Sequence, residues 1–512
     1  MTKTSAVLLV AIFLAACGGD DDGAYPGNHK GSADAGAPPP YYSDGSAAAD
    51  AGVAPEEPPA EEEYGKWIEN DFVDTQKEPL STFSIDVDTA SYTIMRQNVT
   101  KGILPDPNGV RVEEYVNYFK YIYPQPTDAP FSINMDAAPS KFGPGYHMMR
   151  IGLQGKEIAK SERKPANLVF LVDVSGSMQA SNKLGLVKKA LNFLVEQLED
   201  KDTLGIVTYS SQVKELLQPT EITDNKAAIV SAINSLYASG GTAGGPGIQT
   251  AYAMAKNGFI EGGINRVILC TDGDFNIGLA GSALVTLVEE KRDEGITLSV
   301  LGFGMGNYKD NFLEDLSNKG NGNYAYIDNQ QEAEKVFGEK LLGTLQVIAK
   351  DVKIQVEFDP KTVTKYRLVG YENRLLKPQD FTDDTKDAGE IGAAHAVTAL
   401  YELEMVPGLT PTAGLATVRF RYKDPDGTVS KELTRVIQSK EVATTFEAAG
   451  PDFRFAAAVV EFAEILRHSK HSDGADFDTV KAIASAASGD DTDRLELVKL
   501  VETAKGLWTA GK

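Results

Sequence analysis

The chain has 512 residues and a formal net charge of −23, and these two values limit its organisation and its partners. A chain of this length exceeds one ordinary hydrophobic core, so several domains are expected. The charge disfavours nucleic acid as a partner, because phosphate backbones attract clustered lysines and arginines. It excludes little else, since many secreted proteins have acidic surfaces.

The first residues predict a secretion signal and a lipid anchor. Lys3 precedes an apolar run from Ala6 to Ala16, which is too short to span a bilayer. The run ends directly before Cys17 and resembles the lipobox of bacterial lipoproteins. That resemblance implies that residues 1–16 are a signal peptide and that Cys17 is diacylated. The alternative is an ordinary signal peptide, cut after a small-x-small pattern, with Cys17 present by chance.

The next segment, residues 17–65, is predicted to be a disordered acidic tether. It is rich in Gly, Ala, Pro, Asp and Glu and has too few large apolar side chains to offset the entropy of ordering. A flexible chain of this length spans on the order of 40 Å. Cys270 is the other of the two cysteines in the chain; it lies in an apolar run and is expected to be a buried core thiol. Because acylation would occupy Cys17, no internal disulfide is predicted.

Two distant parts of the chain alternate polar and apolar residues as β-strands do. The early strands fall within residues 127–164 and the later ones within residues 351–445. We expect them to form one β-sandwich with a domain inserted between them. Residues 66–126 combine a short alternating run with a helical pattern and predict a small α/β cap. Apolar residues at helical spacing predict a helical tail in residues 446–512.

The insert, residues 165–350, alternates apolar strands with helices. Strands are expected at residues 167–173, 202–209, 266–271 and 296–302, and helices at residues 183–199, 225–237, 247–257 and 282–294. Strands that are apolar on both faces and separated by helices are typical of a doubly wound parallel sheet. Such sheets bind their ligands beyond the carboxyl ends of the strands.

The first strand of the insert leads directly into Asp173, Ser175 and Ser177, in the order Asp-x-Ser-x-Ser. At this spacing a turn can bring one carboxylate and two hydroxyl groups to the same side, and hard cations prefer such oxygen ligands. The run alone does not establish a metal site, because Asp and Ser also favour turns and helix N-caps.

Two further segments are expected at the same edge of the sheet. Thr242 lies in the glycine-rich loop of residues 239–245, and Asp272 follows the strand of residues 266–271. The five side chains Asp173, Ser175, Ser177, Thr242 and Asp272 therefore predict a metal site. The alternative is a group of polar residues that cap helices and turns without a metal.

These segments resemble the metal-ion-dependent adhesion site of von Willebrand factor type A domains. Residues 83–92, 111–114 and 452–456 resemble the flanking parts of bacterial YfbK-type lipoproteins that contain this domain. The resemblance covers nearly the whole chain after the tether. It implies an α/β fold in which a doubly wound, Rossmann-like von Willebrand domain is inserted in a β-sandwich, with a small N-terminal α/β cap and C-terminal helices.

The resemblance also implies a cofactor, a partner and a location. Ser175 and Ser177, together with Thr242 or Asp272, would contact Mg²⁺ or Mn²⁺ directly or through water, and Asp173 and Asp272 would supply negative charge. An open coordination position would accept an acidic residue of a protein partner. The glycine after Cys17 implies sorting away from the inner membrane in Gram-negative bacteria, so we expect a cell-envelope protein anchored in the outer membrane by its lipid.

Two function classes remain open at this point. In the first, the protein holds a partner through the metal, for adhesion or envelope assembly; in the second, it is a structural scaffold whose metal only stabilises the domain. An enzyme is disfavoured, because no catalytic set is found and no small-molecule substrate is expected. Asp86 and Asp88, for example, begin like the Asp-x-Asp-x-Thr pattern of aspartate-nucleophile phosphatases. The position that needs the threonine is Ala90, so the pattern fails.

Overall fold

The computed structural model describes residues 68–242, 244–273, 281–304, 310–340, 343, 345–386, 388–472 and 476–510. The predicted signal peptide and the tether with Cys17 lie outside these ranges. Within the described ranges, no helix has both the length and the apolar character needed to cross a membrane.

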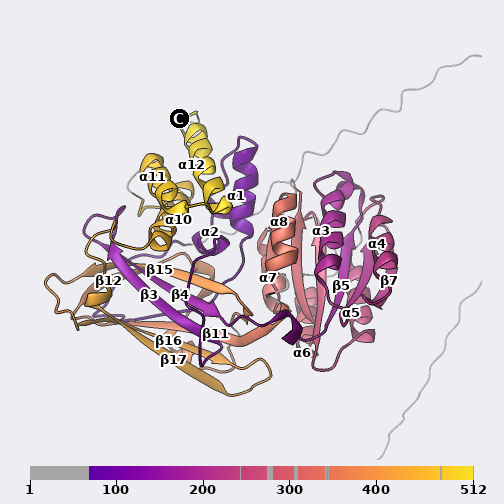
Figure 1. The fold of residues 1–512 in the computed structure, drawn as a ribbon, viewed down its shortest axis with the longest axis horizontal. Coiled ribbons are helices and arrows are strands. Elements are labelled where there is room, and N and C mark those ends of the chain that lie inside the picture. Colours follow the sequence, from indigo (N-terminus) through magenta and orange to yellow (C-terminus); the bar gives the residue numbers. More distant parts are fainter. Residues whose placement is uncertain are drawn as a thin grey trace, which may run out of the picture. The chain divides into compact units, whose positions relative to one another are not determined.

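The α/β region is built on a six-stranded sheet with the order β10-β9-β8-β5-β6-β7 (Figure 1). The strands are β5 (Ala166–Asp173), β6 (Thr203–Tyr209), β7 (Val213–Glu221), β8 (Ile264–Thr271), β9 (Thr297–Phe303) and β10 (Tyr324–Ile327). All neighbours run parallel except β7, which pairs antiparallel with β6. The four predicted strands are confirmed within two residues. The prediction missed β7, which is half-buried and exposed along its length, and the four-residue β10.

Helices cover both faces of this sheet, which confirms the doubly wound fold (Figure 1). They are α3 (Leu184–Gln197), α4 (Lys226–Asn234), α5 (Gly244–Asn257), α6 (Gly281–Asp293), α7 (Asp310–Lys319) and α8 (Gln330–Glu334). Alternate residues of β5 enter two separate apolar layers. Phe170 packs in the layer that contains Leu191 of α3, whereas Leu171 packs in the layer that contains Ile248 of α5.

The remaining strands form two antiparallel sheets that pack as a sandwich. The first has the order β1-β12-β15-β4-β3 and the second the order β13-β2-β11-β16-β17. Their bounds are β1 (Val73–Asp74), β2 (Leu80–Ser84), β3 (Phe131–Pro139), β4 (His147–Gly155), β11 (Val347–Phe358), β12 (Val363–Val369), β13 (Leu375–Leu376), β14 (Ile391–Gly392), β15 (Ala396–Met405), β16 (Gly414–Lys423) and β17 (Ser430–Gln438). Strand β4 precedes the α/β region and pairs with β15, which follows it. The α/β region is therefore an insertion in the sandwich, as predicted.

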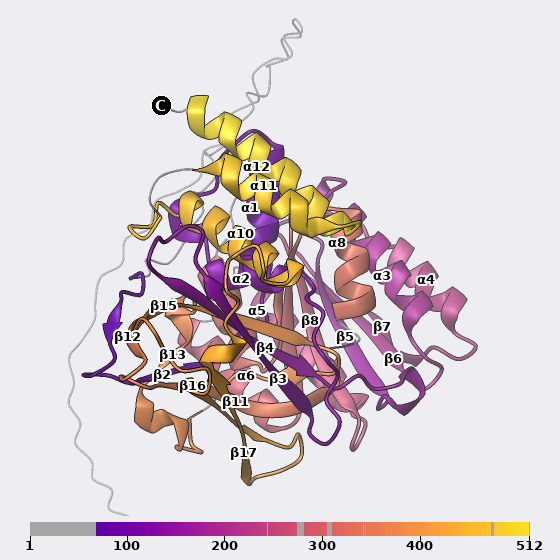
Figure 2. The same ribbon diagram turned by 60° about the vertical axis from the view of Figure 1, so that its left-hand side comes forward.

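The N-terminal segment contributes to three parts of the fold at once. Its strands join the sandwich, because β1 pairs with β12 and β2 pairs with β11. Its helices α1 (Ala90–Thr100) and α2 (Val112–Tyr118) pack with the C-terminal helices α10 (Pro451–Leu466), α11 (Phe477–Ser488) and α12 (Thr492–Ala510) (Figure 2). Ala90 and Ile94 of α1 also enter an apolar layer of the inserted domain. The partners of these strands lie far along the chain, where local sequence patterns carry no information about pairing.

Cys270 lies on the central strand β8 and is fully buried. Burial raises the pKa of its thiol well above the ordinary value, because an apolar interior disfavours the thiolate. The prediction of a buried core thiol is confirmed, and this cysteine is chemically quiet.

Candidate metal-binding site

Two segments at the ends of parallel strands meet at the carboxyl edge of the inserted sheet. Asp173 is the last residue of β5, and Asp272 directly follows the last residue of β8. The two strands are neighbours in register, with Val172 opposite Cys270, so their ends bring the two aspartates together. The Asp272 carboxylate acts electrostatically on Asp173, as expected for groups at one edge.

The turn after β5 is ordered by hydrogen bonds among the predicted residues. The backbone N–H of Ser175 donates to Asp173 Oδ1 over 2.8 Å, and the hydroxyl groups of Ser175 and Ser177 lie 2.9 Å apart. Asp173 and Ser175 are buried, whereas Ser177 is exposed. The Asp-x-Ser-x-Ser run therefore gathers its three oxygen-bearing side chains, with the second serine toward solvent.

The glycine-rich loop is fastened to this turn by backbone contacts. The N–H of Ser239 donates to the carbonyl of Val174 over 2.7 Å, and the N–H of Gly176 donates to the carbonyl of Gly240 over 2.9 Å. Gly240 has a φ of +80°, and a Cβ there would lie 2.7 Å from Ser211 Oγ, so only glycine fits without a shift. Thr242 is half-buried and follows two residues later. The loop that carries Thr242 is thus fastened to the Asp173 turn at Ser239 and Gly240.

Asp272 has the most telling surroundings of the five residues. It is 3% exposed, and its Oδ2 accepts a hydrogen bond of 2.9 Å from Lys183 Nζ. Its Oδ1 is buried and has no hydrogen-bond partner within the described ranges of the chain. A buried carboxylate oxygen without a partner costs free energy unless a cation or donor satisfies it. This donor set of carboxylate and hydroxyl oxygens fits a hard divalent cation.

Burial also shapes the acidity of the site. Desolvation raises the pKa of Asp173 to about 6, although the hydrogen bond from the Ser175 N–H opposes the shift. Tyr209, the last residue of β6, donates its hydroxyl proton to Asp173 Oδ2 over 3.0 Å. A cation near Asp173 would favour the ionised carboxylate, so the site is chemically suited to a positive charge.

Two residues around the site were not predicted from the sequence. Tyr209 could have been found, because it ends a strand at the same carboxyl edge. Lys183 could not, since it lies 89 residues from Asp272 along the chain and belongs to no recognised motif.

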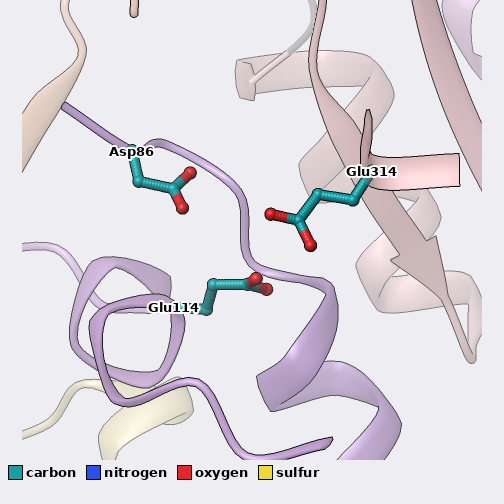
Figure 3. Close-up of side chains that lie close together, drawn as sticks. All are labelled: Asp86, Glu114 and Glu314. Carbon is teal, nitrogen blue, oxygen red and sulfur yellow. The ribbon is translucent and has the colours of Figure 1, made fainter. Parts of the chain in front are cut away.

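A second group of carboxylates lies in the interior, at the junction of the sandwich, the N-terminal helices and the inserted domain. Asp86 follows β2, Glu114 lies on α2 and Glu314 lies on α7, and their side chains point toward one another (Figure 3). One oxygen of each lies within 4.8 Å of the others, and all three residues are buried. By distance alone, this group could also hold a cation.

Arginines already neutralise this second group. Arg374 Nε bonds Asp86 Oδ2 over 3.0 Å and its Nη2 lies 3.5 Å from Glu314 Oε1, while Arg111 pairs with Glu114 and lies 3.6 Å from Glu314. Burial raises the pKa of Glu114 to about 8. Paired guanidinium groups and a protonated carboxyl satisfy such a group without a metal. We interpret it as an ion-paired junction that holds three parts of the fold together.

Family models match nearly all of the described chain. The model of the von Willebrand factor type A domain matches residues 167–339, and one described as von Willebrand factor matches residues 58–150. The model of the C-terminal region of YfbK, described as uncharacterized, matches residues 343–507.

The chain is also similar to whole proteins. It is 37% identical over 478 residues to "Uncharacterized protein YfbK" of Escherichia coli, covering 88% of this chain and 82% of that protein. It is 29% identical over 229 residues to an uncharacterized protein of Synechocystis, covering 44% and 52%. A solved structure, von Willebrand factor type A from Catenulispora acidiphila, aligns over 72% of this chain and 89% of that chain, with a TM-score of 0.42 and 17% identity. The chain therefore belongs to the YfbK family of proteins that contain a von Willebrand factor type A domain.

Proposed function

We propose that the inserted domain holds a protein partner through a divalent cation, Mg²⁺ or Mn²⁺, at the carboxyl edge of its sheet. The observation that carries this proposal is the buried Oδ1 of Asp272, which has no hydrogen-bond partner among the described residues and lies at an edge with the Asp173 turn. A buried oxygen in this state can be satisfied by an ordered water or by an ion, and a cation also offsets the charge of the neighbouring carboxylates.

The residues at this edge would contribute to cation binding in two ways. Ser175, Ser177 and Thr242 offer neutral hydroxyl oxygens, while Asp173 and Asp272 supply the negative charge. When bound, the cation supplies strong electrostatic attraction for an incoming carboxylate. Because neutral hydroxyls make up much of the ligand set, the cation stays electrophilic enough to attract an aspartate or glutamate of the partner. We therefore propose a binding role, with no catalytic step.

The location of this activity is proposed from the N-terminal sequence. Cys17 would carry the lipid, and the acidic tether of residues 17–65 would hold the folded body away from the headgroups. The protein would then act in the cell envelope, at the outer membrane, in adhesion or in envelope assembly.

A structural role for the metal is the second candidate. The loops of the site are cross-connected, as the bonds from Ser239 to Val174 and from Gly176 to Gly240 show, so a cation there would also brace them. In that case the sandwich and the helices would make the functional contacts.

A capture experiment separates these two candidates. The full-length wild type is immobilised and exposed to envelope extract, once with Mg²⁺ and once with EDTA. The variants Asp272→Ala and Asp293→Ala are exposed to the same extract with Mg²⁺. Asp293 ends α6, and its side chain is 71% exposed and bonded to its neighbour Arg292, so it serves as the matched control. With Mg²⁺ present, we expect the wild type and Asp293→Ala to capture the partner. We expect no capture by the wild type in EDTA and none by Asp272→Ala. Capture that survives both EDTA and a folded Asp272→Ala would contradict the adhesion-site proposal and favour the scaffold.

The lipid anchor has its own test. Cells that express the protein are labelled with a fatty-acid analogue. We expect label on the wild type and on Cys270→Ala, whose buried thiol is not a lipid attachment site, and none on Cys17→Ala. Label that persists on Cys17→Ala would refute the assignment.

A further inference from the structure

The side chain of Lys183 enters the candidate metal site from outside the predicted motif. Lys183 directly precedes helix α3, just after the turn that carries Ser175 and Ser177. Its Nζ lies 2.9 Å from Asp272 Oδ2, and its side chain is 15% exposed. The packing around this mostly buried side chain shows what holds its ammonium group at Asp272.

The end of strand β9 forms a seat for this side chain. Gly304 directly follows β9 and has a φ of +83°, and a Cβ there would lie 2.3 Å from Lys183 Cε and 2.6 Å from Cγ. Any side chain at residue 304 would therefore displace the lysine. Lys183 also begins the helix, where its carbonyl accepts the N–H groups of Leu186 and Val187. The ammonium group is thus directed to Asp272 by both its backbone and the packing of its stem.

The charges at this edge show what the ammonium group does. Asp173 and Asp272 bring two negative charges, and the ammonium group of Lys183 places one positive charge beside Asp272. A hard divalent cation binds carboxylate oxygen at a shorter distance than an ammonium does, about 2.1 Å for Mg²⁺. A singly charged and a doubly charged cation repel each other strongly at such separations, so they do not share Asp272 Oδ2.

We infer that Lys183 is a built-in competitor of the divalent cation: it neutralises Asp272 when no metal is bound and must swing out when the metal enters. This inference rests on the metal site proposed above and adds its regulation. The lysine sets a threshold, because the cation is bound only when its concentration is high enough to displace a tethered ammonium group. It also keeps a positive charge beside the buried Asp272 carboxylate when no metal is bound.

Metal titrations of the full chain test this inference. The affinity for Mn²⁺ is measured by isothermal titration calorimetry for the wild type, for Lys183→Met, and for Lys189→Met as a control. Methionine keeps the unbranched stem over Gly304 and removes the charge. Lys189 lies on the same helix and contacts the side chain of Gln330 at the surface over 3.4 Å. We expect the dissociation constant to fall at least tenfold for Lys183→Met and to stay within twofold for Lys189→Met.

The opposite results are equally informative. Unchanged or weaker Mn²⁺ binding by Lys183→Met, with binding by the wild type intact, would overturn the inference and leave the metal site standing. Absence of Mn²⁺ binding in both proteins would overturn the metal site and the inference together.

A second measurement uses only the wild type, in case the variant does not fold. Reductive methylation followed by mass spectrometry reports how accessible each lysine is. We expect the labelling of Lys183 to rise several-fold on saturation with Mn²⁺, while that of Lys189 stays constant. Labelling of Lys183 that does not respond to bound Mn²⁺ would overturn the inference.

Discussion

The molecule gathers carboxylates in two places, and the difference between them lies in the cations that accompany them. At the carboxyl edge of the inserted sheet, Lys183 pairs with Asp272, and Asp272 Oδ1 has no hydrogen-bond partner in the part of the chain that the structure describes. At the interior junction, Asp86 and Glu314 are bonded to the guanidinium of Arg374. Proximity of acidic groups is common to both regions, whereas an unmet need for positive charge is found at the edge.

The two regions also differ in what neutralises them. An arginine offers a rigid fork of five donors, so it joins several carboxylates at once and does not leave easily. A lysine is a flexible point charge that can move away on its stem. We therefore read the junction as a permanent fastening between parts of the fold, and the edge as a site that can exchange its cation. Four predictions test this contrast.

The largest effect is expected at the junction. Arg374 pairs with Asp86, with Glu314 and also with Asp88, whose Oδ2 lies 3.3 Å from its Nη2. Arg374→Ala leaves these buried carboxylates without this partner, and loss of one member of a buried pair costs about 3–5 kcal/mol. Arg421→Ala removes a more exposed pair with Asp384 and should cost about 0–1 kcal/mol. Urea unfolding of both variants measures the difference. Equal losses would show that the junction is no stronger than a surface pair.

The next effect is expected at the edge. Mg²⁺ at one hundred times its dissociation constant should stabilise the wild type by about 2.7 kcal/mol, because it binds only the folded state. Asp272→Asn should abolish this gain, while Asp293→Asn should keep it. Thermal unfolding with MgCl₂, against NaCl at the same ionic strength, measures the gain. An equal shift in all three proteins would mean that Mg²⁺ acts elsewhere.

A pH dependence that needs no metal tests the buried carboxyl group of Glu113, which directly precedes the junction residue Glu114 along the chain. Burial, together with Glu372 and Asp86, raises the pKa of Glu113 to about 8 from an ordinary value of 4.5. The folded state therefore holds this proton more tightly than the unfolded state. The stabilising contribution is complete below pH 4.5 and is lost as the pH rises through about 8.

We expect the melting temperature to fall by a few degrees across this range and Glu113→Gln to flatten the decline. The glutamine oxygen can still accept the Tyr371 N–H that Glu113 accepts over 2.9 Å. Glu357→Gln, a half-exposed position, is the control and should leave the decline unchanged. A decline of the same size in Glu113→Gln would place its origin elsewhere.

The smallest effect concerns the loop that carries Thr242. Gly240→Ala forces an ordinary residue into a left-handed conformation, at a cost of about 1–2 kcal/mol, and brings a Cβ within 2.7 Å of Ser211 Oγ. The loop should shift, and Mn²⁺ affinity should fall. Gly506→Ala lies in helix α12, where a Cβ meets no atom within 4 Å, and should be neutral or slightly stabilising. Unaltered Mn²⁺ affinity in Gly240→Ala would show that the loop does not support the site.

The sequence predicted the parts of this account that depend on local patterns. Apolar runs located β5 and β8, and the rule for carboxyl strand ends then brought Asp173 and Asp272 to one edge. The residues that decide the contrast were out of reach. Lys183 meets Asp272 across 89 residues, and Arg374 meets Asp86 across 288 residues. Such contacts follow from the packing of separate parts of the chain, which periodicity and motifs do not encode.

Anomalous diffraction from a crystal of the full chain grown with Mn²⁺ shows which of the two acidic regions holds a divalent cation. We predict a manganese peak between Asp173 and Asp272, with the Lys183 side chain turned away from Asp272, and no peak among Asp86, Glu114 and Glu314. A peak within the interior junction, or an edge without manganese at saturating concentration, would contradict the account.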